Sequence, residues 1–262
     1  MNRIETLFEQ SNRKLLSVFY TAGFPTLDST ATIARQLQAA GADLIEIGIP
    51  FSDPIADGPV IQESNSVALR NGMTLKLLLG QVAEIRKCVT IPILLMGYLN
   101  PVLQYGIEKF LADASEAGVD GLILPDLPLA EFNIAYKELF IHHRLATVFL
   151  IAPSTSEERI RRIDDLATGF LYAVSSSSIT GAKGDFTDEQ MSYFKRLEQM
   201  KLKNPILTGF GISNAITYEK ASRHSRGAIV GSAFISMMKK SKDMDSDIVK
   251  FLEEIRGKFQ MA

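Results

Sequence analysis

The sequence predicts an α/β protein folded as a single-domain (β/α)8 TIM barrel over residues 1–262, with long loops after strands 2 and 6. The prediction rests on eight apolar, strand-like runs, on amphipathic segments between them, and on the uneven lengths of the intervals. The runs begin near Leu15, Asp43, Pro92, Asp120, Ala146, Gly169, Pro205 and Gly227. Successive starts lie about 30 residues apart, which is the length of one βα unit. An open doubly wound sheet is the alternative, but no glycine-rich dinucleotide fingerprint follows the first run.

Helical periodicity between the runs explains how the strands would be connected. The segments 29–40 and 107–117 each place apolar residues on one face, and each is followed by a glycine that can end a helix. The spacing of Thr155 and Glu158, and of Thr187 and Gln190, is typical of a capping box at a helix start. The last segment carries a helical stripe made of Ile248, Phe251, Leu252, Ile255 and Phe259.

Two intervals are longer than the others, and their extra residues follow the second and sixth runs. The segment 50–72 contains three prolines, whereas the segment 175–186 is rich in serine and glycine. Loops that leave the carboxyl ends of barrel strands form the active face. We therefore expect these segments to act together as a lid, although tolerated surface insertions are the plain alternative.

Composition excludes several classes of protein. With 28 Lys and Arg against 30 Asp and Glu, the net charge is −2, which argues against affinity for nucleic acid or anionic membranes. The single cysteine, Cys88, cannot form an internal disulfide and fits a reducing compartment. No run is apolar enough for a membrane span, and charged residues near the start leave no export signal. We expect a cytoplasmic protein without a metal site, because one cysteine and three histidines are too few for a zinc cluster.

The second strand places one carboxylate inside the predicted barrel. Strand alternation puts Ile45 and Ile47 on one face and Glu46 on the other, so Glu46 points inward near the top. Desolvation there should raise its pKa and make it a proton donor or acceptor, unless a structural salt bridge holds it. Asp57 lies eleven residues further on and supplies a second carboxylate; Asp53 is a third candidate, although Asp-Pro is also an ordinary turn signal.

Glycines near three later strand ends indicate a phosphate site. Gly181 lies in the sixth loop, Gly211 follows the seventh strand, and Gly231 with Ser232 opens a helix after the eighth. Glycine lets backbone N–H groups approach an anion, and a helix N-terminus favours negative charge. Many barrels build their phosphate site from the seventh and eighth loops in this way. The sequence therefore predicts a phosphorylated small molecule as ligand.

The reaction class follows from what the upper face lacks. An imine-forming aldolase needs a lysine at a strand end, but Lys14 precedes the first strand and Lys183 lies out in a loop. A metal-dependent aldolase needs histidines over the cavity, whereas His142 and His143 end a helix. Carboxylate acid/base chemistry on a phosphorylated substrate, without a cofactor in this chain, is what remains.

At these residues the sequence resembles the tryptophan synthase α chain family. The run LIEIGIPFSDPIADGPVIQ over residues 44–62 is similar to the family signature and is highly specific. The similarity continues along the chain in the segments 21–25, 124–128, 178–181, 209–213 and 231–232. The resemblance implies cleavage of indole-3-glycerol phosphate to indole and glyceraldehyde 3-phosphate. It also implies transfer of indole to a β chain that carries pyridoxal phosphate, in an α2β2 heterotetramer.

By motif position, the resemblance also implies roles for individual residues. Glu46 becomes the acid/base group, and Asp57 the residue that bonds the indole N–H. Tyr172 becomes a supporting hydroxyl. The walls of the indole pocket would be Phe19 and Phe210, and the phosphate donors would be Gly181, Gly211, Gly231 and Ser232.

One segment departs from the family pattern, and two other functions stay open. Many relatives have an Arg and a Gly in the sixth loop where this chain has serines at 175–178, so loop closure and phosphate screening would differ. A phosphoribosyl-anthranilate isomerase or indole-glycerol-phosphate synthase relative would share the phosphate glycines without needing the 44–62 run. A catalytically idle subunit that only activates a partner would have no need of both Glu46 and Asp57.

Overall fold

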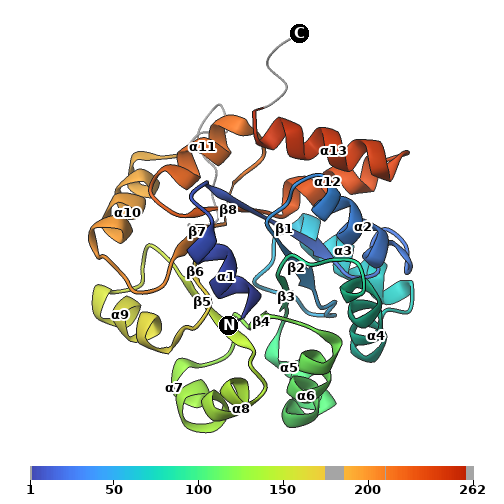
Figure 1. Cartoon of the computed structure of the whole chain (residues 1–262), viewed down its shortest axis with the longest axis horizontal. Coiled ribbons are helices and arrows are strands. Elements are labelled where there is room, and N and C mark those ends of the chain that lie inside the picture. Colours follow the sequence, from blue (N-terminus) through green and yellow to red (C-terminus); the bar gives the residue numbers. More distant parts are fainter. Residues whose placement is uncertain (1, 175–185, 210, 258–262) are drawn as a thin grey trace.

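Eight parallel strands close into a barrel in the computed structural model, which describes residues 2–174, 186–209 and 211–257 (Figure 1). Each strand pairs with the next along the chain, and β8 pairs with β1 to close the ring. The predicted fold is confirmed, and each strand begins within two residues of its predicted start. The strands are β1 (Leu15–Thr21), β2 (Leu44–Gly48), β3 (Ile93–Met96), β4 (Gly121–Ile123), β5 (Ala146–Ile151), β6 (Leu171–Ala173), β7 (Ile206–Thr208) and β8 (Gly227–Val230).

Helices surround the barrel on the outside (Figure 1). Amphipathic faces explain their positions, because the predicted apolar stripes are the residues that face the strands; in α6, Phe110, Leu111 and Ala114 are buried. The helices are α2 (Ser29–Ala39), α3 (Pro59–Arg70), α4 (Leu75–Arg86), α5 (Leu99–Tyr105), α6 (Ile107–Ala117), α7 (Leu129–Glu131), a π-helical segment (Phe132–Tyr136), α8 (Lys137–His142), α9 (Glu157–Leu166), α10 (Asp188–Gln199), α11 (Ala215–Arg223), α12 (Ser232–Lys240) and α13 (Met244–Ile255). Within the described residues none of them is long and apolar enough to cross a membrane.

Helix ends follow the local sequence signals with one exception. Gly118 ends α6 in the left-handed conformation, and Thr187 and Gln190 form the predicted capping box of α10. The predicted box of Thr155 and Glu158 is wrong. Ser156 caps α9 instead, while the Thr155 hydroxyl accepts a hydrogen bond from the N–H of Ala152 in the preceding turn. Two adjacent hydroxyl residues compete for this cap, and the turn decides between them.

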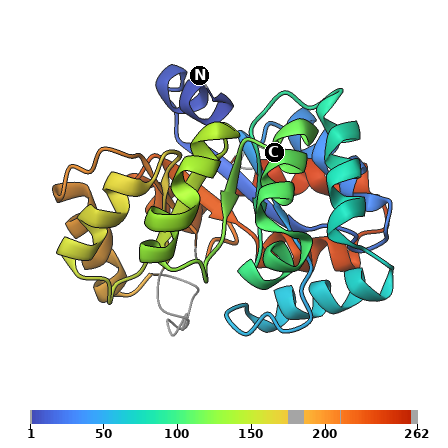
Figure 2. The same ribbon diagram turned by 90° about the horizontal axis from the view of Figure 1, so that it is seen from below.

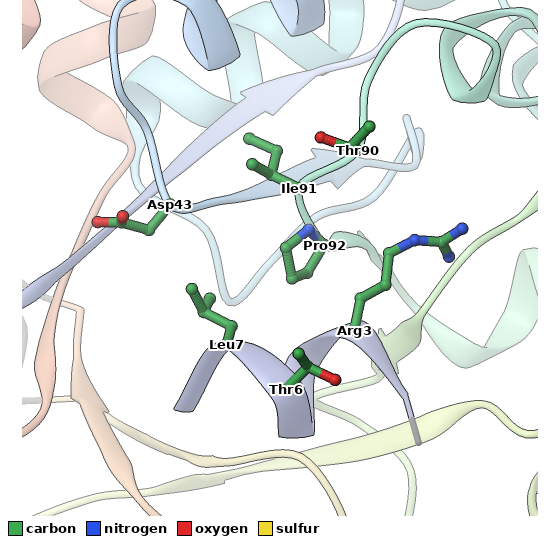
Figure 3. A pocket seen from close by; sticks show the side chains of 7 residues that line it. All are labelled: Arg3, Thr6, Leu7, Asp43, Thr90, Ile91 and Pro92. Carbon is green, nitrogen blue, oxygen red and sulfur yellow. The ribbon is translucent and has the colours of Figure 1, made fainter. Parts of the chain in front are cut away.

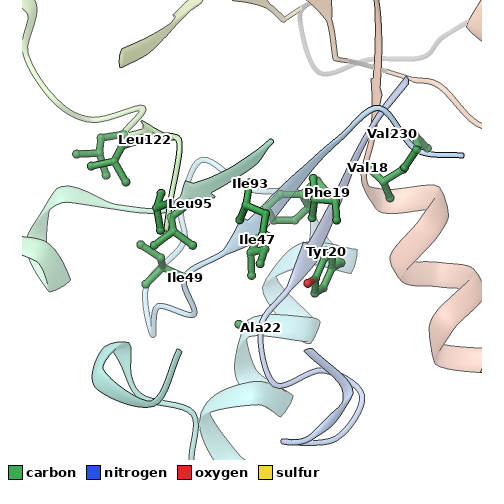
Figure 4. Packing of buried hydrophobic residues seen from close by; sticks show 14 of the residues in the cluster. Val18, Phe19, Tyr20, Ala22, Ile47, Ile49, Ile93, Leu95, Leu122 and Val230 are labelled. Atoms are coloured by element: carbon green, nitrogen blue, oxygen red, sulfur yellow. The ribbon is translucent and has the colours of Figure 1, made fainter. Parts of the chain in front are cut away.

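The core has two parts because each strand has two buried faces. The larger part lies between the strands and the surrounding helices, where Val18, Tyr20, Ile47 and Ile93 pack together (Figure 4). The smaller part fills the barrel itself with alternate residues of the same strands, among them Leu15, Leu44, Leu94, Tyr172 and Ile229. The barrel interior is therefore a packed core, and a polar group inside it is unusual.

An N-terminal helix that the sequence analysis did not predict closes one end of the barrel. Helix α1 (Arg3–Gln10) stands outside that end (Figures 1 and 2). Its buried side chains, Ile4 and Phe8, belong to the core inside the barrel, where the Phe8 ring lies 6.0 Å from the ring of Phe170. Because the strands begin at this end, α1 leaves the opposite, carboxyl end of the barrel for the functional site.

Polar contacts secure the closed end around a hollow of about 250 Å³ between α1 and the starts of β2 and β3 (Figure 3). Asp43, which lines it, accepts hydrogen bonds from the backbone N–H of Leu16 at 2.7 Å and from Arg256 at 2.8 Å. The Asp120 carboxylate forms ion pairs with Arg3 at 2.9 Å and with Arg86 at 2.7 Å. These carboxylates join strand starts to helices, and we assign this end of the barrel to stability.

Candidate active site

The segment that follows β2 is more ordered than the predicted long loop. Helix α3 (Pro59–Arg70) occupies most of residues 50–72, so the irregular part is confined to the turn that precedes it. In that turn the N–H of Asp57 donates to the carbonyl oxygen of Pro54 at 3.0 Å. The Gln62 amide of α3 in turn donates to the carbonyl oxygen of Asp57 at 2.9 Å. Pro59 suits the first helical turn because its missing N–H would have no partner there. The turn that carries Asp57 is thereby tied to its own helix.

Glu46 lies inside the barrel, as strand alternation predicts, and is completely buried. Its Oε1 accepts a hydrogen bond from the Ser17 hydroxyl at 2.6 Å, and its Oε2 is buried with no hydrogen-bond partner among the described residues. Burial raises the pKa of Glu46 to about 7, and the Ser17 hydrogen bond acts in the opposite direction. The predicted rise in pKa is confirmed. No cation of the described chain pairs with Glu46, so the alternative of a structural salt bridge finds no support there.

Asp57 is half-buried and bonded to a tyrosine that the sequence analysis did not consider. The Tyr98 hydroxyl donates to Asp57 Oδ2 at 3.2 Å and accepts from the backbone N–H of Ala56 at 3.0 Å. Burial raises the pKa of Asp57, while the Tyr98 hydrogen bond opposes that rise. The turn folds back toward the barrel and removes part of the carboxylate's hydration, and this desolvation is the larger of the two effects on its pKa.

Tyr172 on β6 interacts electrostatically with both carboxylates. Its pKa is raised well above the usual value by burial first, and then by the negative charges of Glu46 and Asp57. Its ring lies directly against the backbone of Gly209 at the end of β7, where an added Cβ would come within 2.0 Å of the ring. Only glycine fits at position 209 beneath this ring. The structure thus brings Glu46, Asp57 and Tyr172 together at the carboxyl ends of the strands.

Phe19 on β1 links these groups to the end of β8. Its side chain is only 7% exposed, and its ring lies so close to Gly48 that a Cβ there would meet the ring at 2.7 Å. A Cβ on Gly231 would meet the same ring at 3.3 Å. Figure 4 shows Phe19 on β1, the strand that pairs with β2. An aromatic wall therefore extends from the strand that holds Glu46 to the helix start at Gly231.

Of the glycines predicted to bind phosphate, Gly211 and Gly231 lie in the described residues. Gly211 follows β7 with a φ of +64°, a left-handed conformation that favours glycine. Gly231 precedes α12 without any side-chain cap, and Ser232 at the first position of the helix is exposed. The N–H groups of this first turn are therefore left for solvent or an anion. Gly181 and Phe210 lie outside the described residues, as do Lys183 and the serines at 175–178.

Some candidates are not brought to the site, and others were missed. Asp53 is exposed and accepts a hydrogen bond from the Ser52 hydroxyl. His142 and His143 end α8, and no group of metal-binding side chains occurs in the described part of the chain. Sequence reasoning missed Ser17 and Tyr98, although the position of Ser17, two residues before Phe19 on one strand face, was a usable signal.

Comparison with known proteins gives one family. A family model described as tryptophan synthase alpha chain matches residues 6–262. The tryptophan synthase alpha chain of Parabacteroides distasonis is 54% identical over 98% of this chain and 100% of its own length. That of Flavobacterium psychrophilum is 51% identical over 97% and 100%. The crystal structure of tryptophan synthase subunit alpha from Legionella pneumophila matches with a TM-score of 0.89 and 36% identity over 98% of each chain.

Proposed function

Since this chain belongs to the tryptophan synthase alpha chain family, we propose that Glu46 and Asp57 carry out the family's reaction in it. That reaction is the cleavage of indole-3-glycerol phosphate to indole and glyceraldehyde 3-phosphate, and the alpha chain pairs with a β chain. The observation that carries the proposal is a buried carboxyl group with one unpartnered oxygen and a pKa of about 7. Near neutral pH such a group is populated in both protonation states, as a residue that first gives and then takes a proton requires.

Glu46 begins the reaction in its neutral form. It donates its proton to C3 of the indole ring, and the ring nitrogen becomes cationic. The resulting Glu46 carboxylate then accepts the proton of the hydroxyl on the adjacent glycerol carbon. The C–C bond breaks, its electron pair returns to the ring, and the aldehyde C=O forms. Glu46 ends as the neutral acid, so the two proton transfers balance.

Asp57 and Tyr172 act on the charge that develops between these steps. Asp57, bonded to the indole N–H, stabilises the cationic ring nitrogen most strongly when it is ionised. Tyr98 favours this ionised form by donating to Oδ2. The charges of Glu46 and Asp57 both act on Tyr172, which supplies a supporting hydroxyl close to these groups. The two carboxylates thus have separate tasks, in line with their different partners.

We expect Tyr98→Phe to raise the pKa of Asp57, because the variant loses a hydrogen bond to the charged form. The acidic limb of the kcat/KM profile against pH should therefore move to higher pH, with a loss of about three- to tenfold at a given pH on that limb. The measurement is indole release from pH 5 to 9. Tyr105→Phe is the matched control, since the Tyr105 hydroxyl bonds Asp113 away from the site. An acidic limb that stays in place in Tyr98→Phe would contradict the proposed role of this bond.

The uncapped start of α12 is proposed as the phosphate site. Gly231, Ser232 and, from the neighbouring loop, Gly211 supply backbone N–H groups without side chains in the way. Gly181 and Phe210, which lie outside the described residues, complete the proposal as a further phosphate donor and a second wall of the indole pocket. The closeness of Phe19 to Gly231 supports a substrate whose ring and phosphate occupy adjacent parts of one site.

We expect Gly231→Val to raise the KM for indole-3-glycerol phosphate by about tenfold or more, because a side chain there blocks the anion and presses on Phe19. Affinity for indole should change much less. Isothermal calorimetry with an uncleavable indole phosphate and with indole separates the two effects. Gly80→Val on the outer helix α4 is the control, since a Cβ there meets nothing within 4 Å. An equal loss for both ligands would indicate general damage to the fold.

The β chain is proposed to dock beside the turn that carries Asp57. Asp53 and Ile55 lie in this turn, and Ile55 is 89% exposed, so it offers a partner an apolar side chain to cover. Docking there would hold the turn and raise the activity of the isolated chain. An α2β2 assembly, pyridoxal phosphate in the β chain, a cytoplasmic location and a single folding domain over residues 1–262 are parts of the same proposal.

We expect Ile55→Asp to weaken binding of the β chain by about tenfold or more, because a charge would replace an apolar contact that docking buries. Indole release by the isolated chain should stay unchanged. Titration of the alpha chain into its β chain, followed by the gain in activity, measures the effect. Ile141→Asp, at the end of α8 that faces the strand starts, is the control. Equal affinities for both variants and the parent would place the interface elsewhere.

One assay tests the proposed function itself. The purified chain is incubated with indole-3-glycerol phosphate, and indole is followed by its fluorescence, which is practical because the chain contains no Trp. Indole release without a β chain supports the proposal. If the native chain releases indole no faster than a denatured control, an idle subunit that only activates its partner is favoured instead.

A further inference from the structure

The two oxygens of Glu46 have unlike surroundings. Oε1 accepts the hydrogen bond of the Ser17 hydroxyl at 2.6 Å, whereas Oε2 has no partner among the described residues although it is equally shut off from solvent. A buried carboxylate oxygen without a donor is costly, so such an oxygen is normally met by a proton, water or ligand. The asymmetry indicates that Oε2 is the oxygen at which protons arrive and leave.

The strand register explains why Ser17 can make this contact. Phe19 of β1 stands opposite Glu46 of β2, and Ser17 lies two residues earlier on the same face. Ser17 is completely buried and stands opposite Leu44, one layer nearer to the closed end of the barrel. The hydroxyl therefore reaches Glu46 from within the core, on the side away from the open end.

We propose that Ser17 is a positioning residue that holds Oε1 of Glu46 and thereby makes Oε2 the oxygen that exchanges the proton with the substrate. The inference rests on the proposed role of Glu46 as the acid/base group. With the Ser17 hydrogen directed at Oε1, the neutral acid carries its own proton on Oε2. The same bond restrains rotation of the carboxyl group, which keeps that proton directed at one point in the cavity.

The hydrogen bond from Ser17 also affects the pKa of Glu46. Ser17 donates to the ionised form and so opposes the effect of burial on the pKa. The other titratable groups nearby are Tyr172 from β6 and Asp57 from the turn after β2, and no cation of the described chain faces Glu46. Ser17 is thus the one neighbour of Glu46 in the described chain that lowers its pKa. Its removal should raise that pKa.

The test compares Ser17→Ala with Ser17→Thr, which keeps the hydroxyl, and with Ser17→Cys, which keeps the size with a weaker donor. The Glu46 carboxyl is titrated directly by carbon-13 NMR of the glutamate-labelled chain without substrate, and Glu46→Gln identifies its signal. We expect Ser17→Ala to raise the pKa of Glu46 by about one pH unit, Ser17→Cys by less, and Ser17→Thr to restore the parent value.

Steady-state kinetics supply the second readout. We expect kcat of Ser17→Ala to fall by about tenfold with KM within about twofold, because the substrate still binds but the proton is less well placed. The alkaline limb of the pH profile should move to higher pH by the same amount as the NMR titration of Glu46. Ser17→Thr should restore the parent kcat and the parent pH profile. Thr147→Val on β5 removes another buried hydroxyl as the control.

Two outcomes overturn the inference: an unchanged Glu46 titration in Ser17→Ala, or a loss of kcat that Ser17→Thr fails to rescue. Neither is confused with failure of the proposed function, which would appear as retained activity in Glu46→Gln. Because the NMR titration needs no turnover, it reports on the Ser17 bond even in that case.

Discussion

Glu46→Gln should abolish measurable indole formation, with kcat lower by about 10²- to 10⁴-fold, while the fold and substrate binding survive. Glutamine keeps the shape of the side chain, and its carbonyl oxygen can still accept the Ser17 hydroxyl. It cannot, however, give a proton to C3 or take one from the glycerol hydroxyl. The loss therefore falls on the chemical step and leaves the surrounding core intact.

Three measurements check this result. Indole release gives kcat, calorimetry with an uncleavable indole phosphate gives affinity, and thermal unfolding reports on the fold. Glu63→Gln is the matched control, because Glu63 is exposed on α3 and pairs with Lys239 at 2.6 Å. Activity of Glu46→Gln within about threefold of the parent would mean that another residue handles the protons.

Asp57→Asn should lower kcat by about a hundredfold with a smaller change in affinity. The amide oxygen can still accept hydrogen bonds from the indole N–H and from Tyr98, so the ground state is held nearly as before. The amide carries no charge, however, and the cationic ring formed after protonation loses its stabilisation. An interaction that matters only in the transition state affects kcat and leaves binding largely unchanged.

The control for this variant lies in the same turn. Asp53→Asn removes an exposed carboxylate close to Asp57 along the chain, and in the isolated chain it should leave turnover unchanged. Single-turnover kinetics and binding of the uncleavable analogue are measured for both variants. If Asp57→Asn loses affinity while bound substrate still turns over at the parent rate, Asp57 is a binding group and not an electrostatic one.

The barrel could be predicted from the sequence because its signals are local and repeated. Apolar runs about 30 residues apart, glycines after amphipathic segments and the box at Thr187 each depend on neighbours in the chain. Glu46 could be placed inside the barrel by the same kind of reasoning, since alternation along a strand requires no knowledge of other strands. The helix α1 was missed because its two buried residues gain their partner, the barrel interior, only after the strands have closed.

The surroundings of the candidate site depended on the tertiary structure. Ser17 reaches Glu46 through the register of β1 and β2, and Tyr98 reaches Asp57 across 41 positions of the chain. Whether Asp57 is hydrated or half-buried depends on how the turn before α3 folds over the barrel. The sequence by itself pointed to Glu46 and Asp57 as the candidate residues for the chemistry, and it determined on which strand face Glu46 lies. Only the packed structure decided their partners, burial and pKa values, because hydrogen bonds and desolvation depend on groups that are distant in sequence and adjacent in space.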